Sequence, residues 1–344
     1  MHPTALSVLA GLALLGATVA RAAPAPPPAA PADAAWREAF ARPAAIPFPE
    51  RNPPTPEKLA LGRTLFFDAT LSRSRTISCA TCHNPSLGWG DGRARAVGEA
   101  GSEMPLRSPT LLNLAWQEPL GWTGRFPDLE SVPFVPITAP LLMDLPEAEL
   151  IARLAGAPAY RAAFAAAFPD GRAGRGAVED ALAVYMRSIV SADAPFDRWR
   201  DGDEAAVSAS AKAGFALFNG RARCAECHAG FAFTDGSFHD VGVGQGDDVG
   251  RGRAFPGSPG LRYAFKTPTL RNVAERAPYL HDGSAPTLRA VIDLYDRGGI
   301  DRPSRSPEIR PLGLTETEKA DLLAFLDTLT GAALATVPPD ARAN

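Results

Sequence analysis

Two short stretches of the chain repeat one pattern of cysteine and histidine. The first reads Cys79-Ala80-Thr81-Cys82-His83 and the second reads Cys224-Ala225-Glu226-Cys227-His228. This spacing is the attachment signature of a c-type heme, in which two thiols bond to the heme vinyl groups and the histidine binds the iron. The two stretches use all 4 cysteines of the chain. The sequence therefore predicts two covalently bound c-type hemes, with His83 and His228 as iron ligands.

Three other uses of paired cysteines stay open at this point: a disulfide, a thioredoxin-like redox pair and a four-cysteine zinc site. A redox pair does not require a histidine directly after its second cysteine. A zinc site does not require that histidine twice. The repeated histidine therefore favours heme attachment over all three alternatives.

Length and composition indicate a soluble protein with two domains. A chain of 344 residues is long enough for two domains with their own cores. Its hydrophobic content of 46% and charged content of 21% are ordinary for a soluble globular protein. The formal net charge of −3 and the lack of a basic tract argue against a nucleic-acid partner.

The N-terminus resembles a secretory signal. An apolar run from Leu6 to Val19 leads into Ala20-Arg21-Ala22, a small-x-small cleavage pattern. The run is short for a membrane span, so we expect residues 1–22 to be cleaved rather than kept as an anchor, with no stable membrane insertion afterwards. Bacterial c-type heme attachment takes place outside the cytoplasm, which agrees with a periplasmic location. Residues 23–35, rich in proline and alanine, are expected to be a disordered lead-in.

Helical patterns dominate the rest of the chain, and no segment has a convincing strand pattern. Thr55-Pro56-Glu57 begins a helix with a capping hydroxyl and an early proline, and Glu318 forms a capping box with Thr315. The fold class is therefore expected to be all-α. The expected helices cover residues 56–67, 145–168, 177–190, 210–218, 287–296 and a final segment that starts at Thr315.

The sequence around the two heme motifs is duplicated. Residues 108–115 resemble residues 267–274 at a separation of 159 positions, and the same separation relates Gly124 to Gly283 and Leu129 to Leu288. The sequence therefore predicts one heme domain repeated twice. The expected segments are an N-terminal domain (36–194), a C-terminal domain (195–335) that begins with a linker at 195–204, and a tail (336–344).

The two copies differ at the residue that faces the iron opposite the histidine. In the second copy Tyr295 lies seven residues past Leu288, and its equivalent in the first copy is Pro136. A tyrosine oxygen binds metal, whereas proline has no side-chain donor. We therefore expect Tyr295 to close heme 2, while heme 1 keeps an open face at which small molecules react.

Other roles remain open for these residues. Tyr295 as a surface or packing residue is one alternative, and His239 or His281 as the iron ligand is another. We expect His281 to bond a heme propionate or to order its loop instead. His239 is expected near the edge of heme 2.

These features resemble those of bacterial diheme cytochrome c peroxidases, and more closely those of the MauG-like branch. The resemblance runs from about Leu61 to Leu329. It is most specific at residues 61–68 together with the first heme motif, at 265–273 and at 278–283. It implies two cytochrome c-like domains, with a peroxidatic N-terminal heme and an electron-transfer C-terminal heme.

The resemblance also implies roles for single residues. Members of the peroxidase branch carry methionine at the position of Tyr295, and MauG-like members carry tyrosine. A hard, anionic oxygen ligand stabilises oxidised iron and should lower the potential of heme 2. Trp122 matches the inter-heme tryptophan, whose ring would carry electrons between the hemes, although core packing is the alternative. Pro136 matches the pocket proline of the family.

Several positions depart from the family. Glu99 takes the place of the switchable distal histidine, so heme 1 should be open in every redox state. The pocket glutamine and the catalytic glutamate are replaced by Val132 and Leu142, which cannot move the proton that peroxide cleavage requires. Glu99, Glu130 and Asp144 are the acids considered as substitutes, or else they are solvated surface acids.

An interdomain calcium ion is a further implication of the resemblance. Ser108 takes the place of an asparagine ligand, and the backbone oxygens of Arg276 and Pro278 remain as ligands. The alternative is that the side-chain cation of Arg276 fills the space.

The implied function is that of a periplasmic diheme oxidoreductase. It would reduce hydrogen peroxide at heme 1 with electrons relayed from heme 2, or oxidise a partner protein through the same hemes. The expected partners are a small redox protein (a c-type cytochrome or a cupredoxin) or a protein substrate. The alternative is a non-catalytic electron carrier or a heme-based sensor, which the apolar Val132 and Leu142 favour.

Overall fold

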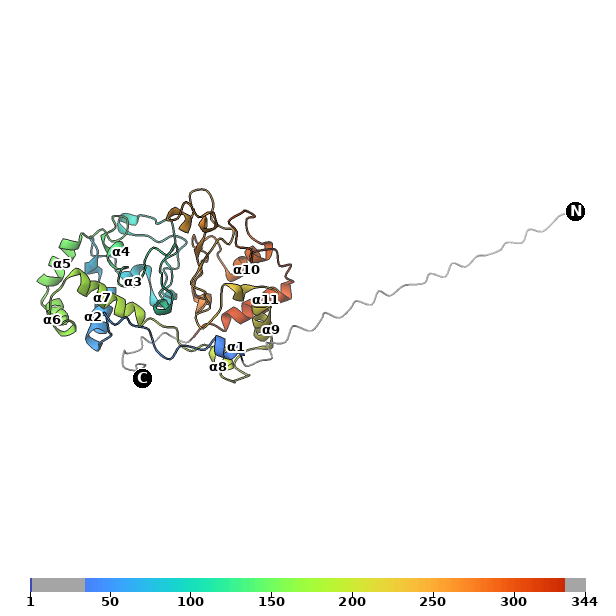
Figure 1. Ribbon diagram of the computed structural model, residues 1–344, viewed down its shortest axis with the longest axis horizontal. Helices are drawn as coiled ribbons and strands as arrows, with labels where there is room; N and C mark the ends of the chain where they lie inside the picture. Colours follow the sequence, from blue (N-terminus) through green and yellow to red (C-terminus); the bar gives the residue numbers. More distant parts are fainter. Residues whose placement is uncertain (2–34, 332–344) are drawn as a thin grey trace.

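The computed structural model describes Met1 and residues 35–331. Two helical domains lie side by side in it, with α2 to α7 on one side and α9 to α11 on the other (Figure 1). The expected signal segment (1–22), nearly all of the expected lead-in (23–34) and the expected tail (336–344) lie outside these residues. No helix within the described part of the chain is both long enough and apolar enough to cross a bilayer.

The first domain is built on two packed helices, α2 (Pro56–Phe67) and α7 (Arg175–Arg187). Helix α2 begins where the sequence predicts, because the Thr55 side chain accepts a hydrogen bond from the Lys58 amide (3.1 Å). The other helices are α3 (Cys79–Cys82), α4 (Phe134–Thr138), α5 (Glu147–Gly156) and α6 (Pro158–Ala167). The core is apolar and includes Leu61, Leu65, Phe66, Leu112, Leu129, Phe134, Phe164 and Tyr185.

The second domain repeats this design with α9 (Ala209–Asn219) packed on α11 (Glu316–Asp327). The capping box predicted at Thr315 is present, since the Thr315 amide donates to Glu318 (2.8 Å) and the Glu318 amide donates back (3.3 Å). Helix α10 is Leu288–Arg297. Two short strands, β1 (Phe238–His239) and β2 (Phe265–Lys266), pair antiparallel. The all-α prediction is therefore confirmed, apart from this two-residue ladder.

The duplication is visible in the close approach of the central helices. A Cβ on Gly62 would overlap the Ala181 carbonyl of α7, and a Cβ on Gly214 would overlap the Asp321 carbonyl of α11. Glycine at both places lets the helix backbones touch. Two isolated antiparallel bridges also correspond at the separation of 159, one between Leu120 and Phe126 and the other between Tyr279 and Ala285.

Two expectations about the domain boundaries are wrong. Ala35, expected as the last residue of the lead-in, begins α1 (Ala35–Ala39), and Trp36 packs in the core of the second domain rather than the first. The expected linker is largely helical, because residues 195–200 form α8 (Pro195–Arg200). Its Phe196 is buried in the second core, and Asp197 accepts hydrogen bonds from the buried Arg271 (2.7 and 2.9 Å). These contacts add the linker to the second domain.

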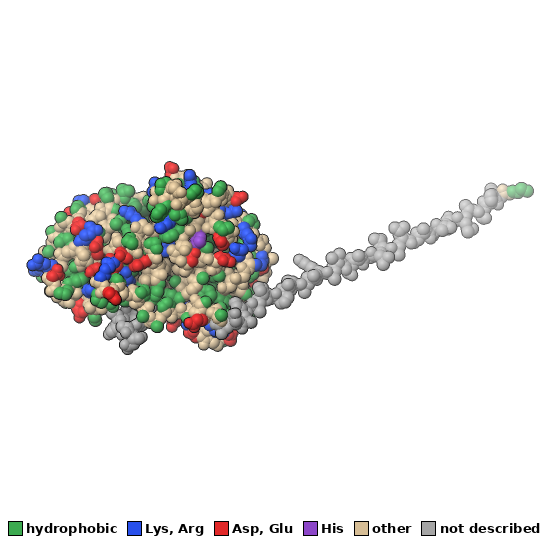
Figure 2. All heavy atoms as spheres, viewed as in Figure 1, with side chains coloured by type: hydrophobic (Ala, Val, Ile, Leu, Met, Phe, Trp, Pro, Cys, Tyr) green, Lys and Arg blue, Asp and Glu red, His purple; other side chains and the backbone are tan. Residues whose placement is uncertain are grey.

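The surface carries charges of both signs. Lysine, arginine and acidic side chains are mixed over the face shown in Figure 2. Side chains mixed in this way create no large field of one sign on that face, so long-range steering is weak there.

The helix packing can be tested at Gly62. Alanine favours helix formation, so Gly62→Ala would stabilise an isolated helix by about 1 kcal/mol. In this fold its methyl would instead press on the Ala181 carbonyl, and we expect a loss of about 1–3 kcal/mol in the free energy of unfolding.

Denaturant titration of the heme-loaded protein measures this change. Gly176→Ala in α7 is the control, because no atom lies within 4 Å of a Cβ placed there. An equal or higher stability of Gly62→Ala would show that the helices are not packed as described.

Candidate heme-binding sites

None of the four cysteines forms a disulfide, so the disulfide alternative is wrong. The two pairs lie in different domains, on α3 and on the turn formed by Cys224–Glu226, which also excludes a shared four-cysteine zinc site. Burial raises the pKa of Cys79 and of Cys224 to about 12. Such thiols stay protonated at neutral pH and are poor at disulfide exchange, unlike those of a thioredoxin-like pair.

Both histidines are oriented by the same backbone device. His83 Nδ1 lies 3.2 Å from the Trp89 carbonyl oxygen, and His228 Nδ1 lies 2.9 Å from that of Phe233. The hydrogen bond places the proton on Nδ1 and leaves Nε2 with a lone pair for iron. Burial lowers the pKa of both imidazoles and keeps them in the neutral form that binds metal.

The carbonyls that orient the histidines come from residues with unusual backbone conformations. Trp89 has φ of 61° and Phe233 has φ of 51°, in a region that few residues other than glycine adopt. A threonine hydroxyl holds the residue before each of them: Thr110 donates to Gly88 (2.7 Å) and Thr269 to Ala232 (2.6 Å). The repeated Pro-Thr-Leu segments thus support the two histidines.

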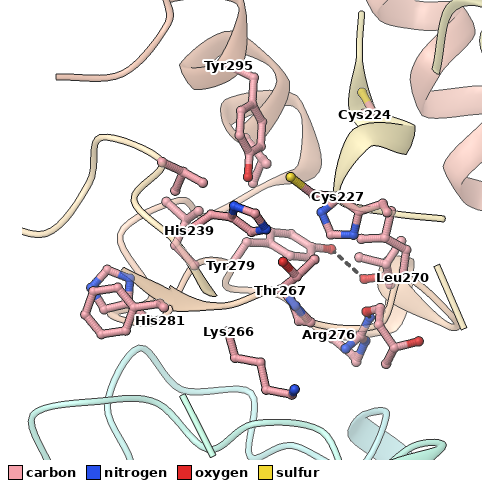
Figure 3. A pocket seen from close by; sticks show the side chains of 18 of the residues that line it. Cys224, Cys227, His239, Lys266, Thr267, Leu270, Arg276, Tyr279, His281 and Tyr295 are labelled. Carbon is pink, nitrogen blue, oxygen red and sulfur yellow. Dashed lines mark hydrogen bonds between the residues drawn. The ribbon is translucent and has the colours of Figure 1, made fainter. Parts of the chain in front are cut away.

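A large cavity surrounds the second motif and reaches the domain junction, with Cys224, Cys227, His228 and Tyr295 in its lining. Figure 3 shows its polar side chains. Lys266 and Arg276 also line it, and neither forms an ion pair within residues 35–331. Burial lowers the pKa of Lys266 to about 8 and that of Arg276 to about 9. The two propionates of a heme suit such cations, so the residues of this site fit a c-type heme.

Tyr295 is the candidate ligand that points into this cavity without a competing partner among the contacts of the described residues (Figure 3). Burial raises the pKa of its hydroxyl. The two competing histidines each form a hydrogen bond from Nε2 to a carboxylate. His239 bonds Asp235 (2.6 Å), and His281 bonds Asp248 (2.7 Å). The hydrogen bond to Asp235 raises the pKa of His239 to about 10, which favours its cationic form over a metal ligand.

The residues expected at the first heme meet around one short loop. The Glu99 amide donates to the Leu142 carbonyl (2.7 Å), and the Met143 amide donates to the Pro136 carbonyl (3.1 Å). Pro136 lies in α4, and Val132, just before it, packs on the first core. The residues predicted at the first heme thus lie close together, and their roles stay predictions.

The three acids considered as proton carriers have different surroundings. Glu130 is buried and forms a salt bridge to Arg187 (2.5 Å), which lowers its pKa together with Asn52. Asp144 pairs with Arg73 (2.5 Å). Within residues 35–331 Glu99 is paired with no cation, and it accepts hydrogen bonds from the Ser74 hydroxyl and amide (2.9 and 3.1 Å). Glu99 is therefore the acid that keeps both partial exposure and proximity to Leu142.

Aromatic rings connect the two domains at the junction. The Trp122 indole nitrogen donates to the Arg107 carbonyl (2.9 Å), and its backbone carbonyl accepts from the Lys266 amide of the second domain (2.8 Å). Its ring centroid lies 6.5 Å from that of His281, which stacks on Phe265 at 3.6 Å. Trp122 is thus a junction residue that also lines the cavity.

The calcium ligands expected at this junction do not fit an ion. The Ser108 hydroxyl donates to Asp91 (3.2 Å), and the Arg276 guanidinium turns to the Asn272 and Thr269 carbonyls. The backbone oxygens of Arg276 and Pro278 both accept hydrogen bonds from the Arg107 side chain. The alternative, in which the Arg276 side chain fills the space, is wrong, because Arg107 makes these contacts.

Sequence reasoning missed three of these features. Trp89 and Phe233 act through backbone carbonyls, which no residue type reveals. The duplicated Pro-Thr-Leu segment pointed to the repeated threonines. The carbonyls to which their hydroxyls donate could be identified only from the folded structure.

The threonine support predicts a separate effect on each heme. Thr269→Val removes the support of the segment whose Phe233 carbonyl accepts the hydrogen bond from His228 Nδ1. A weaker hydrogen bond makes the imidazole a weaker donor to oxidised iron. The reduction potential of heme 2 should therefore rise while that of heme 1 is unchanged. Thr110→Val should give the mirror result, and redox titration followed by absorption measures both. Equal shifts of both potentials in either variant would contradict this assignment.

Tyr295 as ligand predicts a change of coordination at heme 2. Tyr295→Phe removes the oxygen, so heme 2 should become five-coordinate, as read by resonance Raman spectroscopy. Tyr279→Phe is the matched control, because Tyr279 lines the same cavity but its hydroxyl donates to the Val273 carbonyl (3.1 Å). Unchanged coordination in Tyr295→Phe would place the ligand elsewhere.

Comparison with known proteins agrees with both heme sites. The family profile described as di-haem cytochrome c peroxidase matches residues 56–205, and the cytochrome c profile matches residues 211–330. The methylamine utilization protein MauG of Methylorubrum extorquens is 51% identical over 298 residues, covering 86% of this chain and 84% of that protein. A cytochrome-c peroxidase of Denitromonas iodatirespirans is 35% identical, covering 83% and 84%.

A solved structure extends the agreement to the fold. The crystal structure of a MauG-like protein associated with microbial copper homeostasis superposes with a TM-score of 0.78 at 32% identity, covering 83% of this chain and 93% of that one. With the thiols, the oriented histidines and the duplicated domains already in view, these similarities show that the chain belongs to the family of bacterial diheme cytochrome c peroxidases and MauG proteins, oxidoreductases with two c-type hemes.

Proposed function

We propose that the chain reacts with hydrogen peroxide at the first heme and exchanges electrons with a partner protein through the second. The observation that carries this proposal is the asymmetry between Pro136 and Tyr295, which occupy equivalent places in the two copies. Proline cannot bind iron, so it leaves one face of the first site for a small molecule. Tyr295, directed into the second cavity, would close that site to exogenous ligands.

The cysteines and the oriented histidines of each site suit this proposal. The hemes supply reversible iron redox chemistry when bound. Cys79, Cys82, Cys224 and Cys227 would hold them covalently, while the carbonyls of Trp89 and Phe233 keep the iron-binding histidines in one orientation. A fixed, neutral imidazole with a strong Nδ1 hydrogen bond favours the higher oxidation state of the metal, as oxidative chemistry requires.

Glu99 is the proposed proton carrier at the first site. Cleavage of peroxide needs a base that moves a proton from one oxygen to the other. Leu142 has no such group, but its carbonyl accepts a hydrogen bond from the Glu99 amide. The Glu99 carboxylate accepts hydrogen bonds from Ser74. Glu99 thus provides an acid beside the position where the family resemblance places one.

Trp122 is the proposed bridge for electrons between the sites. Its indole contacts the His281 ring, which stacks on Phe265, and all three line the cavity of the second heme. The backbone hydrogen bond from Lys266 to Trp122 fixes the ring at the junction. Packed aromatic rings provide a short route that does not depend on domain motion.

The partner and the compartment are inferred from the sequence and the chemistry. The heme attachment motifs and the N-terminal apolar run support a periplasmic location. There the partner would be a c-type cytochrome, a cupredoxin or a protein whose side chain is oxidised. The mixed surface charges in Figure 2 suit docking that is governed by local contacts rather than by a strong field.

Rapid mixing of the oxidised diheme protein with hydrogen peroxide tests the proposal. We expect the Soret absorption to change within seconds of mixing. The change should then reverse when an electron donor is added. Fast carbon monoxide binding to the reduced protein without any response to peroxide would contradict it and would favour an electron carrier or a gas sensor.

The proposed role of Glu99 as the base predicts that its substitution slows the peroxide reaction. Glu99→Gln keeps the shape but removes the base, so the rate should fall about 10²-fold. Leu142→Glu in that variant should restore part of the rate, because it adds a carboxylate at the neighbouring position. Glu103→Gln, on the exposed part of the same loop, is the control. A rate that is equal in Glu99→Gln and Glu103→Gln would exclude Glu99 as the base.

A further inference from the structure

Arg107 is a buried cation whose charge faces backbone oxygens of the other domain. Its residue is 8% exposed, and its Nη2 donates to the Arg276 carbonyl (2.9 Å) while its Nη1 donates to the Pro278 carbonyl. Both carbonyls belong to the second domain, and Arg107 belongs to the first. The guanidinium is therefore a direct link across the junction.

The surroundings of Arg107 resemble those of a metal ion rather than those of a salt bridge. Among the ion pairs within residues 35–331 none includes Arg107, although many other arginines of the chain pair with acids. Its two terminal nitrogens donate instead to carbonyl oxygens, the neutral ligands that hard cations such as calcium prefer, while the Asp91 carboxylate favours the charge without a direct contact. A buried charge of this kind persists only where such partners are fixed around it.

The backbone of Arg107 continues the same link. Its amide donates to the His281 carbonyl (3.0 Å), and its own carbonyl accepts from the Trp122 indole (2.9 Å). On the opposite side, Gly88 packs so closely on the Arg276 side chain that a Cβ would overlap it. One residue thus holds both the loop that carries His281 and the tryptophan between the hemes.

We propose that Arg107 is a built-in cation that takes the place of a divalent metal ion at the domain junction, so that the protein joins its domains and positions Trp122 without calcium. A guanidinium delivers two planar donors to two oxygens, which is the task that an oxygen-bound ion would otherwise perform. The proposal concerns the junction alone and is independent of the reaction that the hemes carry out.

The heme-loaded wild-type protein provides the first test. After dialysis against a chelator and then against metal-free buffer, we expect calcium well below one equivalent, with an unchanged thermal midpoint and unchanged heme potentials. Calcium that is retained at one equivalent, or a thermal midpoint that falls on chelation and returns with calcium, would overturn the proposal. This test remains decisive even where a variant fails to fold.

Arg107→Asn provides the second test, because it replaces the cation by an oxygen ligand. The variant should lose about 5 °C or more in thermal midpoint, as expected for the loss of buried charged hydrogen bonds. Added calcium should restore the midpoint and the wild-type separation of the two heme potentials. Restoration by a divalent ion is a signature that a purely packing role would not give.

Arg93→Asn is the matched control, since Arg93 is an exposed arginine of the same loop region. Its thermal midpoint should equal that of the wild type and should not respond to calcium. A loss of stability in Arg107→Asn that calcium does not reverse would show that Arg107 does not occupy a cation site, and would overturn the proposal.

Discussion

Each domain depends on one hydrogen bond, from the Nδ1 proton of the iron-binding histidine to a backbone carbonyl. That bond requires Trp89 or Phe233 to adopt a positive φ, and a threonine of the Pro-Thr-Leu segment holds the preceding residue in place. The heme motif and the downstream repeat are therefore one unit, although His83 and Thr110 are 27 positions apart (110 − 83) and His228 and Thr269 are 41 apart (269 − 228). The helix pairs α2–α7 and α9–α11 provide the frame that keeps this unit fixed.

The two copies diverge at α4 and α10, the segments that we expect opposite the histidines. Helix α10 has 10 residues and presents Tyr295, whereas the corresponding α4 has 5 residues and contains Pro136. Proline lacks an amide donor and carries no metal ligand, so it both shortens the helix and leaves the site without an oxygen. The proposed difference in reactivity between the two sites rests on this divergence, and Trp122 and Arg107 lie at the junction between them.

The sequence predicted those features that residue type and spacing determine. The heme motifs, the duplication, the cap of α2 at Thr55 and the capping box at Thr315 are all recognisable because specific side chains make them. Helix α8 was missed because its proline at the start looked like a linker, whereas buried Phe196 and the Asp197–Arg271 pair fix it in the second core. Tertiary contacts overrode the local signal there.

The site was predicted less completely than the fold. The backbone carbonyls of Trp89 and Phe233 have no sequence signal. At the junction the sequence offered calcium or the Arg276 side chain, whereas the Arg107 side chain makes these contacts. Such contacts join segments far apart in the chain, so only the folded arrangement selects between neighbouring arginines. The position of Tyr295 in the cavity lining agrees with the sequence, where the duplication identified Pro136 as its counterpart, and its role as a ligand stays a prediction.

Electron paramagnetic resonance of the oxidised diheme protein tests the central claim most directly, because it reports the coordination of both irons at once. The asymmetry between Pro136 and Tyr295 predicts one high-spin signal from an open heme 1 and one low-spin signal from a heme 2 closed by the tyrosine. Two low-spin signals, with both irons fully ligated by protein side chains, would contradict the account.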